Sequence, residues 1–524
     1  MHCEYIFYIF VVVKITKMTD KKIRVRFAPS PTGPLHMGGV RTALFNYLFA
    51  KQHNGDFILR IEDTDSARFV PGAEEYIIEA LNWCGIKFDE GVNIGGKHAP
   101  YRQSERKDIY LKYAEQLIAN DYAYYAFDAA EELDAIRKEY EIEKKTFIYN
   151  STVRKQMKTS LTLPADEVKR LLTEANNWTI RFKMPENEVV KIIDIIRGEV
   201  SVNTNTLDDK VLWKKADELP TYHLANIVDD YLMEITHVIR GEEWLPSLPL
   251  HVLLYRAFEW QHPQFAHLSL LLKPDGKGKL SKRDGDRLGF PVFPLEWKSP
   301  ETGEISKGYR EDGYFPEAFV NMLALLGWNP GTEQELFTLD ELIKLFDLKR
   351  VIKSGARFNP DKAKWFNAQY LKQKSVENLA LLYKGVTKNK ISNKPDSYIE
   401  KVCELIKERA SFISDFWGLS YYFFTTPDSY EEKTVKKYWK EETPVHMREL
   451  HDILSNVNNF TKEETEHIVH KWIESNNLGM GQIMNAFRLC IVGAAMGPNM
   501  FEIIEMIGKD ETLKRIESAI SKLK

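Results

Sequence analysis

The sequence predicts a multidomain protein in which an α/β part with a split parallel sheet is followed by an all-α part. A chain of 524 residues exceeds what one hydrophobic core supports, so several domains are expected. Strand, loop and helix patterns occur in two separate stretches, near residues 23–61 and 222–272. From about residue 310 to the end, helical patterns follow one another with few glycines. Together these three features predict the fold class.

The first α/β stretch begins with a strand over residues 23–27, where apolar residues alternate with arginines. A loop rich in proline and glycine runs through residue 35, and apolar residues then recur at helical spacing over residues 40–49. Residues 57–61 form a second apolar strand. A strand–helix–strand unit of this length predicts parallel strands, with ligands bound beyond their carboxyl ends.

The second α/β stretch starts near Tyr222, and an apolar segment, a helical pattern and a short strand follow over residues 232–272. Between the two stretches, residues 104–180 have the pattern of charged helix, and residues 180–220 have a β-like, irregular pattern. The sequence therefore predicts an α/β fold that is split by an insertion of about 100 residues.

The composition argues against several classes of protein. The net charge of −4 excludes a bulk polycation, so any nucleic-acid binding requires local basic patches. The cysteines are far apart and form no C-x-x-C pair, which argues against a zinc knuckle or a disulfide framework. We expect buried thiols in a reducing cytoplasm at these positions: Cys3, Cys84, Cys403 and Cys490.

The N-terminus carries an apolar run over residues 5–13 that is too short to span a bilayer. It lacks the basic region and the small-residue cleavage site of a signal peptide. Met18 resembles an ordinary start. We therefore expect residues 1–18 to lie outside the fold, with residues 1–17 translated from an upstream start codon, and we expect no membrane partner.

The string Pro29–Gly39 places His36, Gly38 and Gly39 where the first strand turns into its helix. A helix N-terminus offers free N–H groups and partial positive charge, which suit phosphate. Glycines there let a nucleotide lie against the backbone. The alternative is a capping histidine in a glycine turn, but so rigid a Pro/Gly loop favours a shaped binding site.

A second string, Lys279–Arg283, carries lysines, a serine and an arginine in a glycine-rich loop. A mobile loop with several cations can close over a triphosphate and stabilise charge on departing pyrophosphate. The alternative is a solvated basic surface loop, which is the usual fate of a run of charges.

Together the two strings resemble the paired ATP-binding signatures of the class I aminoacyl-tRNA synthetases. Four further strings narrow the resemblance to glutamyl-tRNA synthetases of the bacterial type: Arg26–Gly33, Leu59–Asp65, Tyr222–Asn226 and Val238–Trp244. The resemblance runs from about residue 20 to the C-terminus, and the combination of motifs is very specific.

This resemblance implies a split, Rossmann-like catalytic domain, an inserted domain that binds the tRNA acceptor stem, and helical domains that contact the tRNA stem and anticodon. The expected domains are residues 19–103 (catalytic, first half), 104–205 (inserted), 206–272 (catalytic, second half), 273–358 (stem contact, with the lysine loop) and 359–524 (anticodon binding).

The resemblance also implies a glutamate pocket. Arg240 would bind the side-chain carboxylate and Arg26 the α-carboxylate region, since guanidinium groups suit carboxylates. Glu62 would pair with the ammonium group. Tyr222 and Asn226 would complete the pocket through hydrogen bonds, with Ser30 and the Ala28 backbone close by. The alternative for isolated charges of this kind is surface ion pairing.

Around ATP, the resemblance implies catalytic roles for His36, Lys279 and Lys282. The full set expected to bind ATP is His36, Gly38, Gly39, Glu243, Leu272, Lys279, Ser281, Lys282 and Arg283. The glutamate α-carboxylate would attack the α-phosphorus of ATP, and pyrophosphate would leave as its Mg²⁺ complex. The 2′-hydroxyl of the terminal adenosine of tRNA(Glu) would then take the glutamyl group.

No structural zinc is expected, because the stretch 122–128 lacks the cysteines that some relatives carry in the inserted domain. Residues 284–309 are extra length relative to the family, and we expect a surface excursion there. A monomer is the family expectation. Whether tRNA(Gln) is charged as well stays open.

Residues 348–374 form a basic stretch with interleaved aromatic residues, which suits RNA phosphates and bases. The alternative is a solvated helix pair whose aromatic side chains are buried in the core. The candidates for tRNA contact are Arg350, Arg357, Lys364 and Trp365.

Three rival functions fit the sequence less well. A glutaminyl-tRNA synthetase is disfavoured by Arg240, because its pocket must take an amide, and by the helical C-terminal half. A truncated paralogue that modifies a tRNA base would lack residues 360–524. A non-catalytic RNA-binding relative would be expected to lose the lysines or the histidine, and both strings are intact here.

Overall fold

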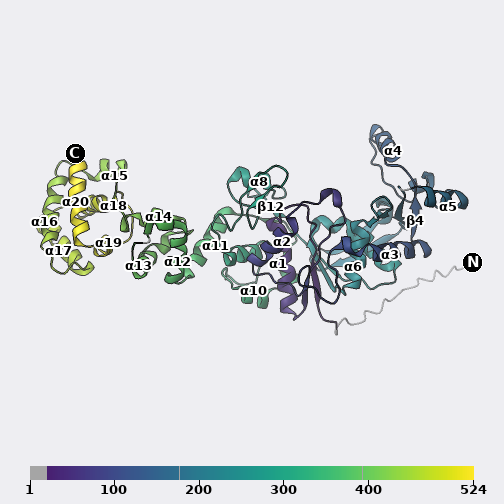
Figure 1. Ribbon diagram of the computed structural model, residues 1–524, viewed down its shortest axis with the longest axis horizontal. Coiled ribbons are helices and arrows are strands. Elements are labelled where there is room, and N and C mark those ends of the chain that lie inside the picture. The colour runs from purple at the N-terminus through teal and green to yellow at the C-terminus, as the bar shows by residue number, and fades with distance from the viewer. Residues whose placement is uncertain (1–20, 176, 392, 524) are drawn as a thin grey trace, which may run out of the picture. The chain divides into compact units, whose positions relative to one another are not determined.

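The computed structural model describes residues 21–523 except residues 176 and 392, so the predicted extension at residues 1–18 lies outside the described residues. The chain divides into two compact units. The α/β unit comprises the described residues up to Gly308 and Val320–Phe358, and the helical unit comprises Tyr309–Phe319 and the residues from Asn359 onward. Figure 1 shows α/β elements in the first and helices α12–α20 in the second.

The first half of the split sheet contains β1 (Arg24–Phe27), β2 (Asp56–Leu59) and β3 (Glu90–Gly91), which pair in parallel. Helix α1 (Met37–Gln52) connects β1 to β2, and α2 (Ala73–Trp83) precedes β3. The predicted strand–helix–strand unit is thus confirmed. One feature differs from the alternating pattern: all four residues of β1 are buried, because its two arginines are paired with acids.

The second half contains α6 (Tyr222–Leu232), β10 (His237–Gly241), α7 (Leu248–Ala257) and β11 (Gln264–Leu268), and β10 and β11 pair in parallel. Strand β10 lies beside β1, and the Thr236 N–H donates to the Arg24 carbonyl oxygen at 2.9 Å. The two halves therefore meet along neighbouring strands despite their separation in sequence.

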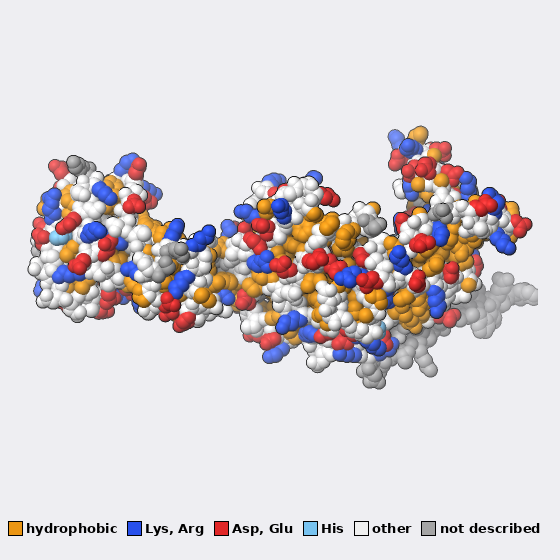
Figure 2. Space-filling view, in the orientation of Figure 1, with side chains coloured by type: hydrophobic (Ala, Val, Ile, Leu, Met, Phe, Trp, Pro, Cys, Tyr) orange, Lys and Arg blue, Asp and Glu red, His pale blue; other side chains and the backbone are white. Residues whose placement is uncertain are grey.

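The segment between the halves is more β-rich than its sequence predicts. Helices α3 (Lys107–Ala119), α4 (Ala130–Ile142) and α5 (Ala165–Glu174) are present, but a short strand, β4 (Ala123–Ala126), lies between the first two. Tyrosines and alanines in so short a run give no period-two signal. Figure 2 shows side chains of both charges on α4 and α5.

Two sheets arise from this segment. Strand β4 pairs antiparallel with β5 (Thr179–Phe182), which continues through β8 (Val211–Lys214) to β9 (Leu219–Pro220). The hairpin β6 (Val189–Asp194) and β7 (Gly198–Asn203) instead extends the sheet of the second half, because β6 pairs with β11.

Further short elements complete the α/β unit. They are β12 (Leu271–Leu272), paired with β15 (Ala356–Arg357), the short helix α8 (Lys282–Leu288), the hairpin β13 (Trp297–Lys298) and β14 (Ile305–Ser306), and α10 (Leu339–Leu345). Helix α9 (Pro316–Leu325) runs across the division between the units.

The helical unit has its own buried apolar core, as the run of helical patterns predicts. Three described cysteines, Cys84, Cys403 and Cys490, are buried free thiols. No helix of the described residues is long and apolar enough to cross a membrane.

The helices of the helical unit are α11 (Pro360–Gln373), α12 (Val376–Thr387), α13 (Asp396–Ile406), α14 (Asp415–Ser420), α15 (Glu432–Tyr438), α16 (Thr443–Ser455), α17 (Lys462–Ser475), α18 (Met480–Val492), α19 (Met500–Ile507) and α20 (Lys509–Lys522).

Asp209 anchors the segment between the halves. Its carboxylate is buried and accepts hydrogen bonds from Tyr124 Oη (2.6 Å), Arg154 Nη1 (3.0 Å) and the Met184 N–H (3.0 Å). We predict that Asp209→Ala destabilises this segment by about 3–5 kcal/mol, because the buried arginine loses its closest carboxylate. Thermal unfolding and hydrogen exchange of residues 123–214 measure the effect.

The matched control is Asp134→Ala, which removes an exposed pair with Arg137 and is expected to change stability by less than about 1 kcal/mol. Equal losses in the two variants would contradict the anchoring role of Asp209.

Candidate active site

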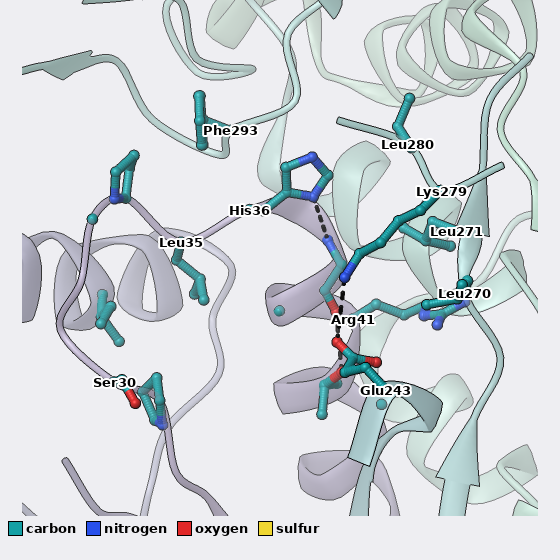
Figure 3. Close-up of a pocket in the computed structure, with 18 of the residues that line it drawn as sticks. Ser30, Leu35, His36, Arg41, Glu243, Leu270, Leu271, Lys279, Leu280 and Phe293 are labelled. Atoms are coloured by element: carbon teal, nitrogen blue, oxygen red, sulfur yellow. Dashed lines mark hydrogen bonds and ion pairs between the residues drawn. The ribbon is translucent and has the colours of Figure 1, made fainter. Parts of the chain in front are cut away.

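A cavity of about 490 Å³ lies beyond the carboxyl ends of the parallel strands (Figure 3). Its walls come from the loop after β1, the first turn of α1, the residues after β10 and β11, and the lysine loop. Parallel α/β sheets bind ligands at this edge. Of the predicted site residues, the cavity lining includes Ser30, His36, Gly38, Gly39, Glu243 and Lys279.

His36 caps the N-terminus of α1, and its Nδ1 accepts a hydrogen bond from the Gly38 N–H at 3.2 Å. Burial, together with the nearby Lys279 ammonium, lowers the pKa of His36 to about 4, so the ring is neutral at pH 7. Because Nδ1 accepts, the proton of the neutral ring is on Nε2. Nε2 is buried and has no hydrogen-bond partner in the described part of the chain, which leaves a donor available to a ligand.

The two glycines after His36 have different roles. A Cβ at Gly39 would lie 2.5 Å from Leu35, so this glycine permits the loop to pack against the helix. A Cβ at Gly38 would make only ordinary contacts, 3.7 Å from His36 Nδ1 and 3.8 Å from Leu271. Because Gly38 has no side chain, the cavity stays open beside the histidine.

Within the lysine loop, only Lys279 and Leu280 line the cavity. Lys279 Nζ lies 3.5 Å from Glu243 Oε1, and Figure 3 shows its amine between the His36 ring and that carboxylate. Lys282 Nζ instead pairs with Glu304 at 3.1 Å. The other predicted ATP residues lie outside the lining: Leu272 belongs to β12, Ser281 bonds Asp284 at the start of α8, and Arg283 is exposed.

The expectation that residues 284–309 form a surface excursion is wrong for residues 291–295, which are buried. Phe293 lines the cavity, with its ring 6.0 Å from His36 in an edge-on arrangement. The carbonyl oxygen of Val292 accepts from the Met37 N–H at 2.9 Å, and that of Leu295 accepts from Tyr76 Oη at 2.6 Å. The apolar string Phe290–Leu295 is the sequence signal for this burial.

Five of the predicted glutamate-pocket residues form a second cluster. Arg240 Nη1 donates to Tyr222 Oη at 2.9 Å, and Asn226 Nδ2 donates to Glu62 Oε1 at 3.1 Å. The fifth, Arg26, acts electrostatically on both Glu62 and Tyr222. The Glu62 N–H donates to the Pro29 carbonyl oxygen at 3.0 Å, which joins this cluster to the loop that carries Ala28 and Ser30.

The charges of this cluster are unequally compensated. Arg26 pairs with Asp230 at 3.0 Å, and the fully buried Arg60 pairs with Glu62 at 3.0 Å and with Asp230 at 2.8 Å. Arg240 is 5% exposed and has no acidic partner in the described part of the chain. The arrangement therefore retains one buried positive charge that suits an anionic group.

Two of these residues, Arg60 and Asp230, were not among the predicted site residues. Burial raises the pKa of Glu62, although Arg60 and Arg26 oppose the shift. Burial likewise opposes ionisation of Asp230, yet Arg26 and Arg60 bring its pKa below the ordinary value. The signal in the sequence is the pair of acids Asp229–Asp230 within an otherwise apolar helix, because buried acids require cationic partners.

Two family models match the chain. One, for the catalytic domain of class I tRNA synthetases (E and Q), matches residues 22–365. The other, for an anticodon binding domain, matches residues 368–520. The chain is a class I tRNA synthetase of the E and Q family.

Known proteins are similar to this synthetase over nearly its whole length. A glutamate–tRNA ligase of Phocaeicola vulgatus is 60% identical over 97% of this chain and 100% of its own, and one of Porphyromonas gingivalis is 59% identical over the same shares. The crystal structure of a glutamate tRNA ligase from Elizabethkingia meningosepticum, in complex with its amino acid, has a TM-score of 0.93 and 56% identity, covering 96% of this chain and 100% of that one.

The predicted tRNA contacts of the synthetase are distributed over both units. In the α/β unit, Arg350 donates to the Pro330 carbonyl oxygen and Arg357 to that of Pro274. In the helical unit, Lys364 is exposed, and the half-buried Trp365 ring has Lys362 Nζ 3.7 Å from its centre. Of the two aromatic residues for which burial was the alternative, Phe366 is buried and Trp365 is not.

The stability of the synthetase is expected to fall as the pH drops from about 6.5 to about 4. Burial lowers the pKa values of His36, His223 and His237 to about 4, whereas unfolded histidines take up protons near pH 6.5. In that window the unfolded state binds more protons, and each histidine costs at most about 1.4 kcal/mol per pH unit. Urea unfolding at pH 7.5, 6.5 and 5.5 measures this slope.

The matched variant is His237→Gln, which removes one buried imidazole that is 6% exposed. Its stability should depend less steeply on pH below 6.5, whatever its absolute stability. An unchanged slope would show that His237 takes up a proton in the folded state.

Proposed function

We propose that this synthetase is a glutamate–tRNA ligase. It joins L-glutamate to the 3′ end of tRNA(Glu) in two ATP-dependent steps, through glutamyl-adenylate, and releases pyrophosphate and AMP. The observation that carries the proposal is the buried Arg240, which has no acidic partner in the described part of the chain and is followed directly by Gly241, a residue of the cavity lining. A substrate with a second carboxylate supplies the missing negative charge.

In the first step, a glutamate α-carboxylate oxygen attacks the α-phosphorus of ATP, and the bond to pyrophosphate breaks. His36 supports this step through its Nε2–H, which is a neutral donor already directed by the Gly38 contact. Lys279 supplies positive charge beside the same ring. In the second step, the 2′-hydroxyl of the terminal adenosine of the tRNA attacks the glutamyl carbonyl carbon, and AMP leaves.

We assign ATP to the cavity beside Gly38, with Glu243 and Leu272 at its border and Mg²⁺ bound with the nucleotide phosphates. Ser281, Lys282 and Arg283 approach the phosphates when the loop closes. For this, Lys282 exchanges Glu304 for the phosphates, a favourable exchange because the pair with Glu304 is partly exposed and weak.

In the glutamate pocket, Arg240 binds the side-chain carboxylate and Arg26 the α-carboxylate region. The Oε1 atom of Glu62 accepts from both Arg60 and Asn226, which leaves Oε2 for the substrate ammonium. Tyr222 supports Arg240, and its ring lies 4.2 Å from that of Trp244. Ser30 and the Ala28 backbone border this pocket.

For the tRNA, we propose that residues 104–205 bind the acceptor stem, 273–358 contact the stem and 359–524 bind the anticodon. Arg350, Arg357, Lys364 and Trp365 are the proposed contacts, since cations and partly exposed aromatic rings suit RNA. We also propose a cytoplasmic monomer. Charging purified tRNA(Glu) and tRNA(Gln) side by side determines whether one or both are substrates.

Glutamate- and tRNA-dependent ATP–pyrophosphate exchange tests the first step. We predict that Lys282→Ala lowers the exchange rate by about a hundredfold or more, because one donor to transition-state charge is worth roughly 3 kcal/mol. The control Lys277→Ala removes an exposed lysine of the same loop that lies outside the Lys279–Arg283 string and should retain near-normal exchange. Full exchange in Lys282→Ala would exclude that lysine from the mechanism.

Arg240→Ala tests the amino-acid pocket. We predict that kcat/KM for glutamate falls by at least about a hundredfold, because a buried charged hydrogen bond and its geometry are lost together. The KM for ATP should change by less than about threefold, since Arg240 does not line the cavity assigned to ATP. Unchanged glutamate kinetics would refute the pocket assignment.

A further inference from the structure

The guanidinium of Arg240 is held by neighbours that are not acids. Its Nε donates to His267 Nε2 at 3.0 Å, and its Nη1 donates to Tyr222 Oη at 2.9 Å and lies 3.2 Å from His251 Nδ1. Its Nη2 has one long contact, to the Trp244 carbonyl oxygen at 3.4 Å. The neighbours therefore fix the plane of the group and leave Nη2 the least engaged.

The contact with His267 leads to a buried carboxylate. His267 Nδ1 lies 2.7 Å from Asp194 Oδ2, and both side chains are fully buried. An arginine Nε–H can only donate, so His267 Nε2 must accept, and the proton of the neutral ring is on Nδ1, where it donates to Asp194. The donor and the acceptor of both hydrogen bonds in the series Arg240–His267–Asp194 are thus determined.

Asp194 is itself fixed by the backbone. Its Oδ1 accepts from the N–H groups of Ile196, Arg197 and His267 at 2.9, 2.8 and 3.3 Å. The three side chains come from neighbouring strands of one sheet: Arg240 on β10 is in register with His267 on β11, and Asp194 on β6 pairs with Phe265, two residues before His267. Residues two apart on a strand share a face, so the sheet aligns all three.

We infer that Asp194 and His267 are positioning residues that orient Arg240 for the side-chain carboxylate of the substrate. This inference rests on the proposed function, in which Arg240 binds that carboxylate. It adds two residues that touch neither glutamate nor ATP in the assignment above. One of them, Asp194, lies in the segment between the two halves of the split sheet.

Because the His267 imidazole lies between Arg240 and Asp194, the guanidinium of Arg240 is held in one orientation and its charge is still available to the substrate carboxylate. A carboxylate in direct contact with Arg240 would orient it, but would also compete with the substrate for its charge. A neutral histidine accepts the Nε–H bond without neutralising the guanidinium. Burial and the neighbouring Arg240 lower the pKa of His267, although Asp194 opposes the shift, so the ring stays neutral as this role requires.

Asp194→Asn tests the donor–acceptor direction of the hydrogen bonds that link Asp194, His267 and Arg240, because asparagine has nearly the same shape as aspartate. The oxygen of the introduced amide must stay with the three backbone N–H donors, so the NH₂ group of that amide faces His267 Nδ1 and moves the ring proton to Nε2. Two donors then face each other at Arg240. We expect the glutamate KM in ATP–pyrophosphate exchange to rise about tenfold or more, while the ATP KM changes less than twofold. A glutamate KM that stays near the wild-type value would overturn the inference.

Two substitutions at His267 separate positioning from packing. In His267→Gln the side-chain oxygen reaches the place of Nε2 and still accepts from Arg240. In His267→Asn the amide reaches only the place of Nδ1 and keeps the bond to Asp194. We expect a glutamate KM within about threefold of wild type for the first and at least tenfold higher for the second. Equal KM values would indicate that the histidine is a structural residue only.

Each variant is compared with the wild-type protein for exchange activity and thermal unfolding midpoint. If the wild-type protein shows no glutamate-dependent exchange, the proposed function fails before the variants are considered. If the wild type is active and the variants lose only thermal stability or kcat, with the glutamate KM unchanged, the positioning inference fails and the proposed function stands.

Discussion

The architecture of the α/β unit depends on a buried cluster of charges at the junction of its two halves. Arg26 and Arg60 come from the first half, and Asp229 and Asp230 come from α6 in the second. Breaking such a cluster at one member costs several kcal/mol, because the remaining charges are left unpaired in a buried place. The cluster therefore joins halves that are separated by the inserted segment, and it does so at the edge of the sheet where the candidate site lies.

The arginines near this cluster differ in whether an acid of the protein compensates their charge. Arg26 and Arg60 are paired with acids of the protein, whereas Arg240 has only neutral neighbours. A single arginine with an unpaired charge is a more selective feature than a generally positive pocket, because an amide or an alcohol cannot replace the missing anion. Beside it, the lining of the cavity proposed for ATP includes two cations, Lys279, which lies beside Glu243, and the buried Arg41, which donates to the carbonyl oxygens of Ser269 and Leu326.

Periodicity was sufficient to predict β1, α1, β2 and the parallel pairing of the split sheet, because these elements have the spacing of ordinary amphipathic or buried segments. Periodicity did not predict features that depend on contacts between residues far apart in the sequence. The arginines of β1 are buried although their alternation indicates a half-exposed strand. Likewise, the short pairing between β6 and β11 has no local signature, and it places Asp194 beside His267. The motif strings contain most of the candidate site, but the role of Arg60, which lies within one of them, and the presence of Asp230 and Phe293 in the site became evident only from the packed structure.

The hairpin β6–β7 limits how far the inserted segment can be treated as a separable module. A chimaera that exchanged residues 104–205 as a block would remove one edge of the β10–β11 sheet and expose the unpaired backbone of β11. Donor segments would therefore have to match the host at strand β6 as well as at the two points of connection. The insertion proposed to bind RNA (residues 104–205) thus contains Asp194, which we infer to orient Arg240 of the proposed amino-acid pocket.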